Sequence, residues 1–316
     1  MAGADRGEVL VSTVQAERVL PSPLLGGIYR ARRPTGPVVG LVVVLGCLIV
    51  GQTIAALVLF PVLGASPEAL LGGAMGLIDQ LAMLLSFGGA AGLLALWIWG
   101  KERRSFGSVG FFPASRGGAH LALGAGVAVV LLSVPVGVNI LSGQFEAGSV
   151  RAAQAGGALV ALIGFIVQAS TEEVITRGYL MQVTYRKWGL TAAIAFQAVV
   201  FTALHGVNAN VSVIGLVNIL LIALVLAFWA LAEGGLWGVC AFHAVWNWLQ
   251  GNVYGIEVSG MDIRTTVLDI GGAPGSTTLL TGGGFGVEGS LLATAVLAIA
   301  TVLAALALRH KLARSG

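Results

Sequence analysis

Long apolar stretches, separated by short polar segments, dominate the chain. A membrane-spanning helix needs about 20 mostly apolar residues. Candidate stretches occupy residues 38–63, 80–100, 118–141, 156–180, 188–206, 211–231, 235–250 and 288–308. The stretch 235–250 is short and has the weakest hydropathic signal. The pattern predicts an all-α membrane protein, a polytopic bundle of about eight transmembrane helices.

The segments outside these stretches are polar. Residues 1–37 are expected to form a cytoplasmic tail, because they are too long and too poor in apolar residues for a cleaved signal peptide. The glycine-rich segment 251–287 is expected to be an external loop, partly disordered. The predicted organisation is therefore a tail, a transmembrane domain over 38–310 and a short cytoplasmic tail over 311–316.

Composition agrees with this class. Hydrophobic residues make up 57% of the 316 residues and charged residues 10%, whereas about 25% are charged in ordinary soluble domains. The net charge of +3 does not indicate nucleic acid, because the basic residues flank apolar runs. Cys47 and Cys240 lie within apolar runs and give no disulfide framework or zinc spacing, so we expect small core residues.

The basic residues predict an orientation. With the N-terminus inside, all but three of the 17 lysines and arginines fall in inner segments. These are Arg6, Arg18, Arg30, Arg32, Arg33, Lys101, Arg103, Arg104, Arg116, Arg186, Lys187, Arg309, Lys311 and Arg314. The positive-inside rule then places both termini in the cytoplasm. We detect no internal repeat, which counts against an inverted-repeat transporter.

Three ionisable residues stand within the fourth apolar stretch: Glu172, Glu173 and Arg177. A charge at membrane depth costs about 3 kcal/mol on insertion scales, so such residues are functional candidates. Residues four apart share a helix face, which predicts an ion pair between Glu173 and Arg177. Glu172 is about 140° around the helix from Arg177, so it is the candidate functional acid.

Two further polar groups follow in later apolar stretches. His205 ends the sequence Phe201-Thr202-Ala203-Leu204-His205, and His243 and Asn247 are four residues apart. Each group alone also fits a structural role, because polar side chains join helices within membranes. Together, a carboxylate, two imidazoles and an amide could form a hydrolytic site with a general base and oxyanion donors. Such a site requires a water-filled cavity inside the bundle.

These groups resemble the three motifs of a known family. The motifs occur in the order Glu172-Glu173-x-x-x-Arg177, Phe201-x-x-x-His205 and His243-x-x-x-Asn247. In this order they resemble the CPBP family of intramembrane glutamic endopeptidases, which is related to the CAAX prenyl endopeptidases and to the bacteriocin-processing Abi group. The resemblance covers residues 155–250 and implies an eight-helix membrane bundle with an interior cavity.

The resemblance also implies roles for individual residues. Glu172 would activate the hydrolytic water together with His205, while His243 and Asn247 would form the oxyanion site. The supporting residues that it implies are Glu173, Arg177 and Phe201. The implied activity is cleavage of peptide bonds in membrane-associated or lipidated substrates, without a metal or cofactor. The expected partners are the lipid bilayer and a peptide or protein substrate, and nucleic acid is not expected.

Other functions stay open at this point. A zinc-dependent membrane hydrolase could use Glu172, His205 and His243 as ligands, although no His-Glu-x-x-His helix is present. A transporter could use Glu172 as a proton relay. A catalytically silent scaffold or immunity protein is a third alternative.

One geometric tension remains. His205 lies 18 residues after Lys187, about 27 Å along a straight helix, whereas Glu172 lies near the inner end of the stretch 156–180. The two can meet if the fourth helix continues to about Gln182, which would bring Glu172 to mid-depth.

Overall fold

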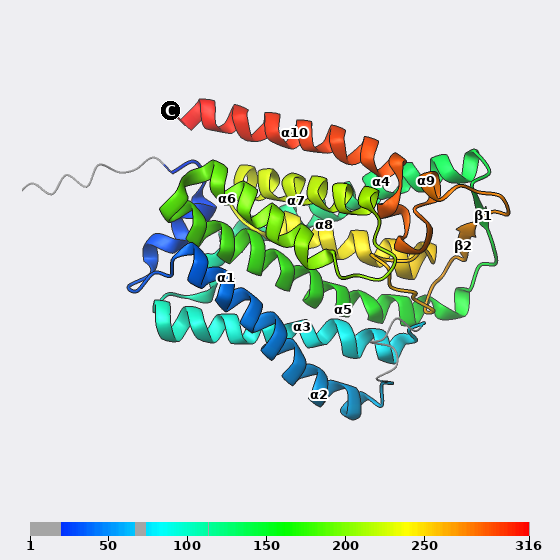
Figure 1. Cartoon of the computed structure of the whole chain (residues 1–316), viewed down its shortest axis with the longest axis horizontal. Helices are drawn as coiled ribbons and strands as arrows, with labels where there is room; N and C mark the ends of the chain where they lie inside the picture. Colours follow the sequence, from blue (N-terminus) through cyan, green and yellow to red (C-terminus); the bar gives the residue numbers. More distant parts are fainter. Residues whose placement is uncertain (1–19, 67–73, 113, 316) are drawn as a thin grey trace, which may run out of the picture.

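Long helices lying side by side build the molecule (Figure 1). The computed structural model describes residues 20–66, 74–112 and 114–315. The α-helices are α1 (Pro37–Gly46), α2 (Gln52–Leu63), α3 (Leu77–Trp97), α4 (Gly117–Leu141), α5 (Ala155–Glu173), α6 (Met181–His205), α7 (Val213–Glu233), α8 (Trp237–Trp248), α9 (Thr278–Thr281) and α10 (Leu291–Ser315). In the described part, the strands are β1 (Phe145–Ala147) and β2 (Ile270–Gly272), which pair antiparallel.

Shorter helical turns connect or extend these helices. Four of them have π-helical geometry: η2 (Cys47–Gly51), η4 (Ile98–Glu102), η8 (Val174–Leu180) and η9 (Leu249–Tyr254). The others are 3₁₀ turns: η1 (Pro23–Arg30), η5 (Phe106–Val109), η6 (Ala114–Arg116), η7 (Ala152–Gln154), η10 (Gly283–Phe285) and η11 (Val287–Gly289). Because η8 joins α5 to α6 without a break, the first acidic motif lies inside a continuous helical run.

The predicted all-α membrane bundle is confirmed. Each of the eight predicted stretches overlaps helical segments. Within the described residues, six helical stretches are long and apolar enough to cross a membrane. They are Pro37–Leu63, Leu77–Glu102, Ala114–Leu141, Ala152–His205, Val213–Glu233 and Leu291–Arg314. The 54-residue stretch Ala152–His205 contains two predicted spans, and the short predicted span corresponds to α8 with η9.

A glycine separates the two spans within the longest stretch. Gly189 has φ 82° inside α6, a left-handed conformation that glycine adopts without steric cost. The helix that begins with α5 therefore continues past Gln182 to this kink. Glu172 then lies about 25 Å from either end of that helix at 1.5 Å per residue. This extension resolves the predicted conflict in depth between Glu172 and His205.

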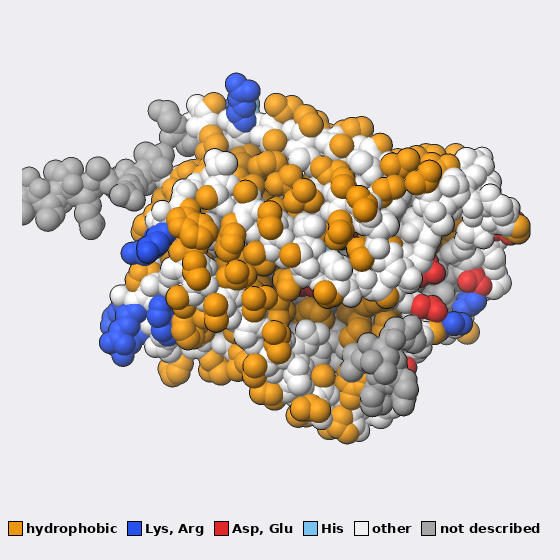
Figure 2. Space-filling model, viewed as in Figure 1, with side chains coloured by type: hydrophobic (Ala, Val, Ile, Leu, Met, Phe, Trp, Pro, Cys, Tyr) orange, Lys and Arg blue, Asp and Glu red, His pale blue; other side chains and the backbone are white. Residues whose placement is uncertain are grey.

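The surface has the distribution expected of an integral membrane protein. Large apolar side chains such as Ile49, Leu57 and Val130 are exposed. Figure 2 shows Lys and Arg side chains at the end of the bundle where α10 ends, and acidic side chains near the opposite end. The gathering of basic side chains at one end of the bundle agrees with the positive-inside rule. The cytoplasmic location of both termini stays a prediction.

Part of the predicted N-terminal tail is folded. Residues 1–19 lie outside the described residues, but η1 packs against the bundle with Leu24, Leu25 and Ile28 fully buried. The side-chain amide of Gln182 donates to the Leu24 carbonyl oxygen at 2.8 Å. The short apolar run within this polar segment explains the difference, because it provides a face that can be buried. Residues 20–36 are thus part of the domain.

The segment 251–287 also differs from its prediction. All of its residues are described, and they form a cap on one end of the bundle instead of a partly disordered loop. Val258, Ile263 and Phe285 are buried. A reciprocal pair of amide hydrogen bonds joins Asn252 to Gln80 of α3 at 2.9 and 3.1 Å. Glycine content suggested disorder, but the scattered apolar residues anchor the segment.

Candidate active site

A cavity of about 690 Å³ lies inside the bundle. Side chains of α5, α6, α7 and α8 line it, together with residues of α3 and of the cap. Five of the predicted site residues contribute to this lining: Glu172, Phe201, His205, His243 and Asn247. The predicted intramembrane cavity is therefore present, and predicted site residues up to 75 positions apart in the sequence, Glu172 and Asn247, meet in it. The other two predicted residues, Glu173 and Arg177, do not line the cavity.

The predicted ion pair forms behind the cavity wall. Arg177 Nη1 donates to Glu173 Oε1 at 3.0 Å, and both side chains are fully buried. The pair lies where α5 passes into η8, and π-helical turns are frequent at functional sites. The Arg177 guanidinium also lies 4.2 Å from the centre of the Phe201 ring. Phe201 therefore packs on the cation, which agrees with its predicted supporting position.

His243 lies between the two glutamates. Its Nδ1 is 2.9 Å from Glu173 Oε1, and its Nε2 is 3.7 Å from Glu172 Oε2. Because an ionised carboxylate can only accept, the hydrogen bond to Glu173 places a proton on Nδ1. The sequence predicted that His243 acts beside Asn247. The additional contact with both acids requires the packing of α8 against α5.

Gln168 belongs to the site, although the motif analysis missed it. Its Nε2 donates to Glu172 Oε1 at 2.6 Å, and its Oε1 accepts from Asn247 Nδ2 at 3.2 Å. The side chain is nearly buried and lines the cavity. A signal was available in the sequence, because Gln168 is a polar residue four positions before Glu172 and thus on the same helix face.

His205 lies at the end of α6 with its ring beside Phe201. The two ring centres are 4.4 Å apart, and His205 Nδ1 is 2.9 Å from the Phe201 carbonyl oxygen. A carbonyl oxygen only accepts, so Nδ1 carries the proton in this contact. In the neutral imidazole, Nε2 then keeps its lone pair and can accept a proton.

The cap provides the opposite wall of the cavity. Ser259, Gly260, Met261 and Asp262 line it, and so does Glu288 before α10. The four cap residues were not predicted as site residues, because the segment 251–287 was expected to be a partly disordered external loop.

Glu288 joins the cap to α8. Its Oε2 accepts from the Ser259 backbone N at 2.9 Å and from Ser259 Oγ at 2.7 Å. Its Oε1 accepts from Trp246 Nε1 at 3.0 Å. Both carboxylate oxygens are thus occupied.

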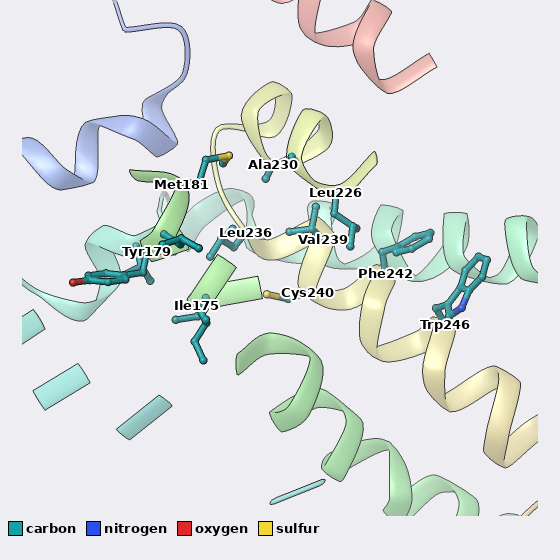
Figure 3. Close-up of a cluster of buried hydrophobic side chains, with 14 of the residues drawn as sticks. Ile175, Tyr179, Met181, Leu226, Ala230, Leu236, Val239, Cys240, Phe242 and Trp246 are labelled. Carbon is teal, nitrogen blue, oxygen red and sulfur yellow. The ribbon is translucent and has the colours of Figure 1, made fainter. Parts of the chain in front are cut away.

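An apolar cluster closes the inner side of the site. Figure 3 shows Ile175 of η8, Leu226 of α7 and Val239, Cys240 and Phe242 of α8 within it. The packing keeps water away from the buried ion pair, and it strengthens that pair because the surroundings have a low dielectric constant. Cys240 is buried and free, as is Cys47. The cysteines accordingly pack as apolar side chains.

Carboxylate and imidazole groups such as those of the site are common metal ligands. Among residues 20–66, 74–112 and 114–315, no group of three or more His, Cys, Asp and Glu side chains is arranged to hold a metal ion. The ring nitrogens of His243 face the two glutamates instead. The zinc alternative therefore has no such ligand cluster in the described part of the chain.

Comparison with known proteins adds one match. Residues 154–249 match the sequence model of a family described as type II CAAX prenyl endopeptidase Rce1-like. This segment is similar to the Rce1-like family. The match covers just under a third of the chain and includes α5, η8, α6, α7, all of α8 and Leu249, the first residue of η9. The resemblance suggested by the three motifs is confirmed over this segment. No curated protein and no solved structure matches the chain.

The Rce1-like match contains the helices that carry all of the predicted site residues, whereas the part of the cavity lining that comes from α3 and the cap lies outside it. The three motifs all fall within it, whereas the cap, η1 and helices α1 to α4 lie outside. The family is one of CAAX-type intramembrane proteases, so the match supports a membrane peptidase in general terms.

Proposed function

We propose that the chain is an intramembrane endopeptidase in which Glu172 activates a water molecule for attack on a peptide carbonyl. The observation that carries the proposal is the convergence of Glu172, His205, His243 and Asn247 on one cavity. The Rce1-like match supports the same class of reaction.

Water activation is assigned to one oxygen of Glu172. Glu172 Oε1 accepts from Gln168, whereas Oε2 is buried and has no hydrogen-bond partner. We assign the proton from water to this oxygen, which requires that substrate entry open its surroundings to the cavity, and His205 Nε2 is a second acceptor that orients the water. The water oxygen attacks the carbonyl carbon. The proton held by Glu172 passes to the leaving amine as the C–N bond breaks.

The oxyanion is assigned to Asn247 and His243. Asn247 Nδ2 has two N–H groups, of which one is donated to Gln168, so the other is available. His243 can donate from Nε2 only as an imidazolium, because its Nδ1 proton is committed to Glu173. Carboxylates at both ring nitrogens stabilise that positive charge. One oxyanion donor contributes typically about 10²- to 10³-fold to kcat.

Glu173, Arg177 and Phe201 are assigned supporting roles. The carboxylate of Glu173 holds the His243 ring, and Arg177 compensates its charge. Phe201 stacks on the guanidinium of Arg177. These residues keep the imidazole in one orientation without touching the substrate.

The proposed substrate is a membrane-associated or lipidated peptide. Much of the cavity wall is apolar, with Met83, Leu84 and Phe87 from α3 and Ile222 and Leu226 from α7. Such walls accommodate apolar side chains or a lipid group within the bilayer. Both termini of the enzyme are proposed to be cytoplasmic, because the basic residues gather at one end.

The test compares new protein termini in membranes that contain wild-type protein or Glu172→Gln at matched abundance. A chelator arm separates the zinc alternative, because zinc chemistry would stop on chelation. Termini that disappear in the variant and survive chelation support a metal-independent protease and identify its substrates. Identical termini in both membranes would overturn the proposal and favour a transporter or a scaffold.

A second assay uses two quenched fluorescent peptides in micelles. One ends in a prenylated CAAX sequence, and the other has the same sequence without the prenyl group. Cleavage of both would show that the lipid is not required, and cleavage of the first alone would show that it is.

A further inference from the structure

Gln168 makes the one side-chain bridge that the described structure gives between Glu172 and Asn247. It lies on α5 one turn before Glu172, and Asn247 lies on α8. The Gln168 amide uses both of its ends, with its nitrogen at 2.6 Å from Glu172 and its oxygen at 3.2 Å from Asn247. Only 6% of the residue is exposed, and the exposed part faces the cavity.

The chemistry of the three groups dictates the order of this bridge. An ionised carboxylate only accepts hydrogen bonds, so Gln168 must present its NH₂ group to Glu172. Its carbonyl oxygen then faces Asn247. Because a carbonyl oxygen only accepts, Asn247 must present its own NH₂ group to Gln168. The charge on Glu172 thus sets the orientation of an amide on another helix.

We propose that Gln168 is a positioning residue that couples the general base to the oxyanion donor. It occupies Oε1 of Glu172 and leaves Oε2 as the oxygen that receives the proton from water. It also turns the amide nitrogen of Asn247 toward the reacting carbonyl. This inference rests on the proposed peptidase function and deepens it.

The bridge is compatible with a complete catalytic cycle. When Glu172 takes a proton on Oε2, its Oε1 remains an acceptor, so the bond from Gln168 persists. The orientation of Asn247 is therefore maintained while the negative charge moves from the carboxylate to the oxyanion. A hydrogen bond to an ionised carboxylate is about twice as strong as a neutral one, which favours this order of donors over its reverse.

Loss of the bridge leaves both partners free to turn. Asn247 could then rotate its amide by half a turn and present Oδ1 to the oxyanion, where two acceptors would repel each other. Glu172 could rotate and offer either oxygen to the water. Misplacement of catalytic groups by about 1 Å can cost roughly 100-fold in rate.

The matched control is a second bridge between amides, whose side chains lie outside the cavity lining. Gln80 of α3 and Asn252 of η9 exchange two hydrogen bonds, and both side chains are fully buried. Neither residue lines the cavity. Gln80→Met therefore removes a buried glutamine from an interhelical pair without changing the site.

The experiment compares wild type, Glu172→Gln, Gln168→Met and Gln80→Met on the prenylated and unprenylated quenched peptides. Methionine has nearly the length of glutamine and lacks its amide. We expect Gln168→Met to lower kcat roughly 10- to 100-fold with KM within about twofold of wild type. We expect Gln80→Met to lower the melting temperature while keeping kcat.

A double-mutant cycle separates positioning from a general structural effect. If Gln168 acts through Asn247, Gln168→Met should lower kcat much less in an Asn247→Ala background than in wild type, because interacting residues are not additive. Equal factors in both backgrounds would overturn the proposal. Unchanged kcat in Gln168→Met, or equal losses in Gln168→Met and Gln80→Met, would also overturn it.

The failure of this inference is distinguishable from failure of the proposed function. Wild-type protein that cleaves neither peptide and produces no Glu172-dependent termini would overturn the peptidase function itself, and the positioning role with it. Active wild-type protein, inactive Glu172→Gln and fully active Gln168→Met would overturn the positioning role alone.

Discussion

Two buried pairs of glutamate and arginine lie on different helical runs, one at the end of the run that begins with α3 and one where α5 passes into η8, and they differ in what surrounds them. Glu173 and Arg177 are 3.0 Å apart, and Glu102 and Arg104 are 2.7 Å apart, with all four side chains fully buried. The first pair holds His243 at the cavity wall. The second pair is not part of the cavity lining.

The second pair joins chain segments near the basic end of the bundle. Glu102 accepts from the Thr35 backbone N at 3.1 Å and from the Tyr179 hydroxyl at 3.4 Å. Arg104 Nη1 donates to Gln182 Oε1 at 2.7 Å. These contacts connect the N-terminal segment and the turn after α3 to the motif helix. Burial and pairing of charge therefore do not by themselves mark the candidate active site, whereas contact with His243, a side chain that lines the cavity, does.

The largest expected difference in cleavage rate is between variants of Glu172 and Glu102. Glu172→Gln should lower cleavage by at least about a thousandfold, because an amide cannot take the proton from water. The fold should persist, since glutamine keeps the shape of the side chain. Glu102→Gln should lower abundance and melting temperature, while the folded fraction keeps its specific activity. Kinetic assays at matched folded concentration check both, and a comparable loss of activity in Glu102→Gln would break the comparison.

Removal of the oxyanion donor should have the next largest effect. Asn247→Ala should lower kcat by about 10²- to 10³-fold, because one N–H group aimed at the developing charge is lost. KM should change little, since the ground-state carbonyl is less charged than the transition state. Steady-state kinetics on the quenched peptides separate the two parameters. A rise in KM at constant kcat would reassign Asn247 to substrate binding.

Substitution of Arg177 or Arg104 tests how much each buried ion pair contributes to the free energy of unfolding. Arg177→Ala and Arg104→Ala should each cost about 3–5 kcal/mol, because each leaves a buried carboxylate without its cation. Melting temperature and yield measure this loss. Replacing the carboxylate as well, in Glu173→Gln with Arg177→Ala, should restore part of the stability.

Activity distinguishes the arginines further. The folded fraction of Arg177→Ala should have lower kcat, because unpaired Glu173 no longer fixes His243. The folded fraction of Arg104→Ala should keep wild-type kcat. Equal yields of Arg177→Ala and wild type would contradict the proposed contribution of the buried pair.

The helical bundle and much of the candidate site could be predicted from the sequence, because both depend on short-range patterns of residues. Apolar length predicts spans, and spacing by four residues predicts that Glu173 meets Arg177 while Glu172 faces elsewhere. The pair is present, and Glu172 lines the cavity. The same reasoning could have included Gln168, which shares the face of Glu172.

Other features depend on contacts between distant segments. The contact of His243 with both glutamates follows from the packing of α8 on α5. The cap over 251–287 depends on single buried residues such as Phe285, which a glycine-rich composition conceals. The kink at Gly189 also has no distinctive signal, because the chain contains 47 glycines. Local periodicity does not specify such long-range arrangements.

A third acid, Glu288, tests which property distinguishes the proposed general base Glu172 from other buried acids. Glu288 is buried and lines the same cavity as Glu172. Its two oxygens accept hydrogen bonds from Ser259 and Trp246, whereas Glu172 Oε2 has no hydrogen-bond partner and lies 3.7 Å from His243 Nε2. If the general base must have a carboxylate oxygen without a hydrogen bond, then an acid that only lines the cavity cannot act as the base. Glu288 is then a structural acid that holds the cap on α8.

Glu288→Gln should therefore have the smallest effect of the series. The new amide can still accept from Ser259, but its NH₂ group would face the Trp246 N–H, so one hydrogen bond is lost. We expect a loss of about 1–3 kcal/mol in stability and wild-type kcat in the folded fraction. Thermal unfolding and peptide cleavage measure the two quantities. A fall in kcat comparable to that of Glu172→Gln would place Glu288 in the chemistry and show that an occupied carboxylate in this cavity also takes part in catalysis.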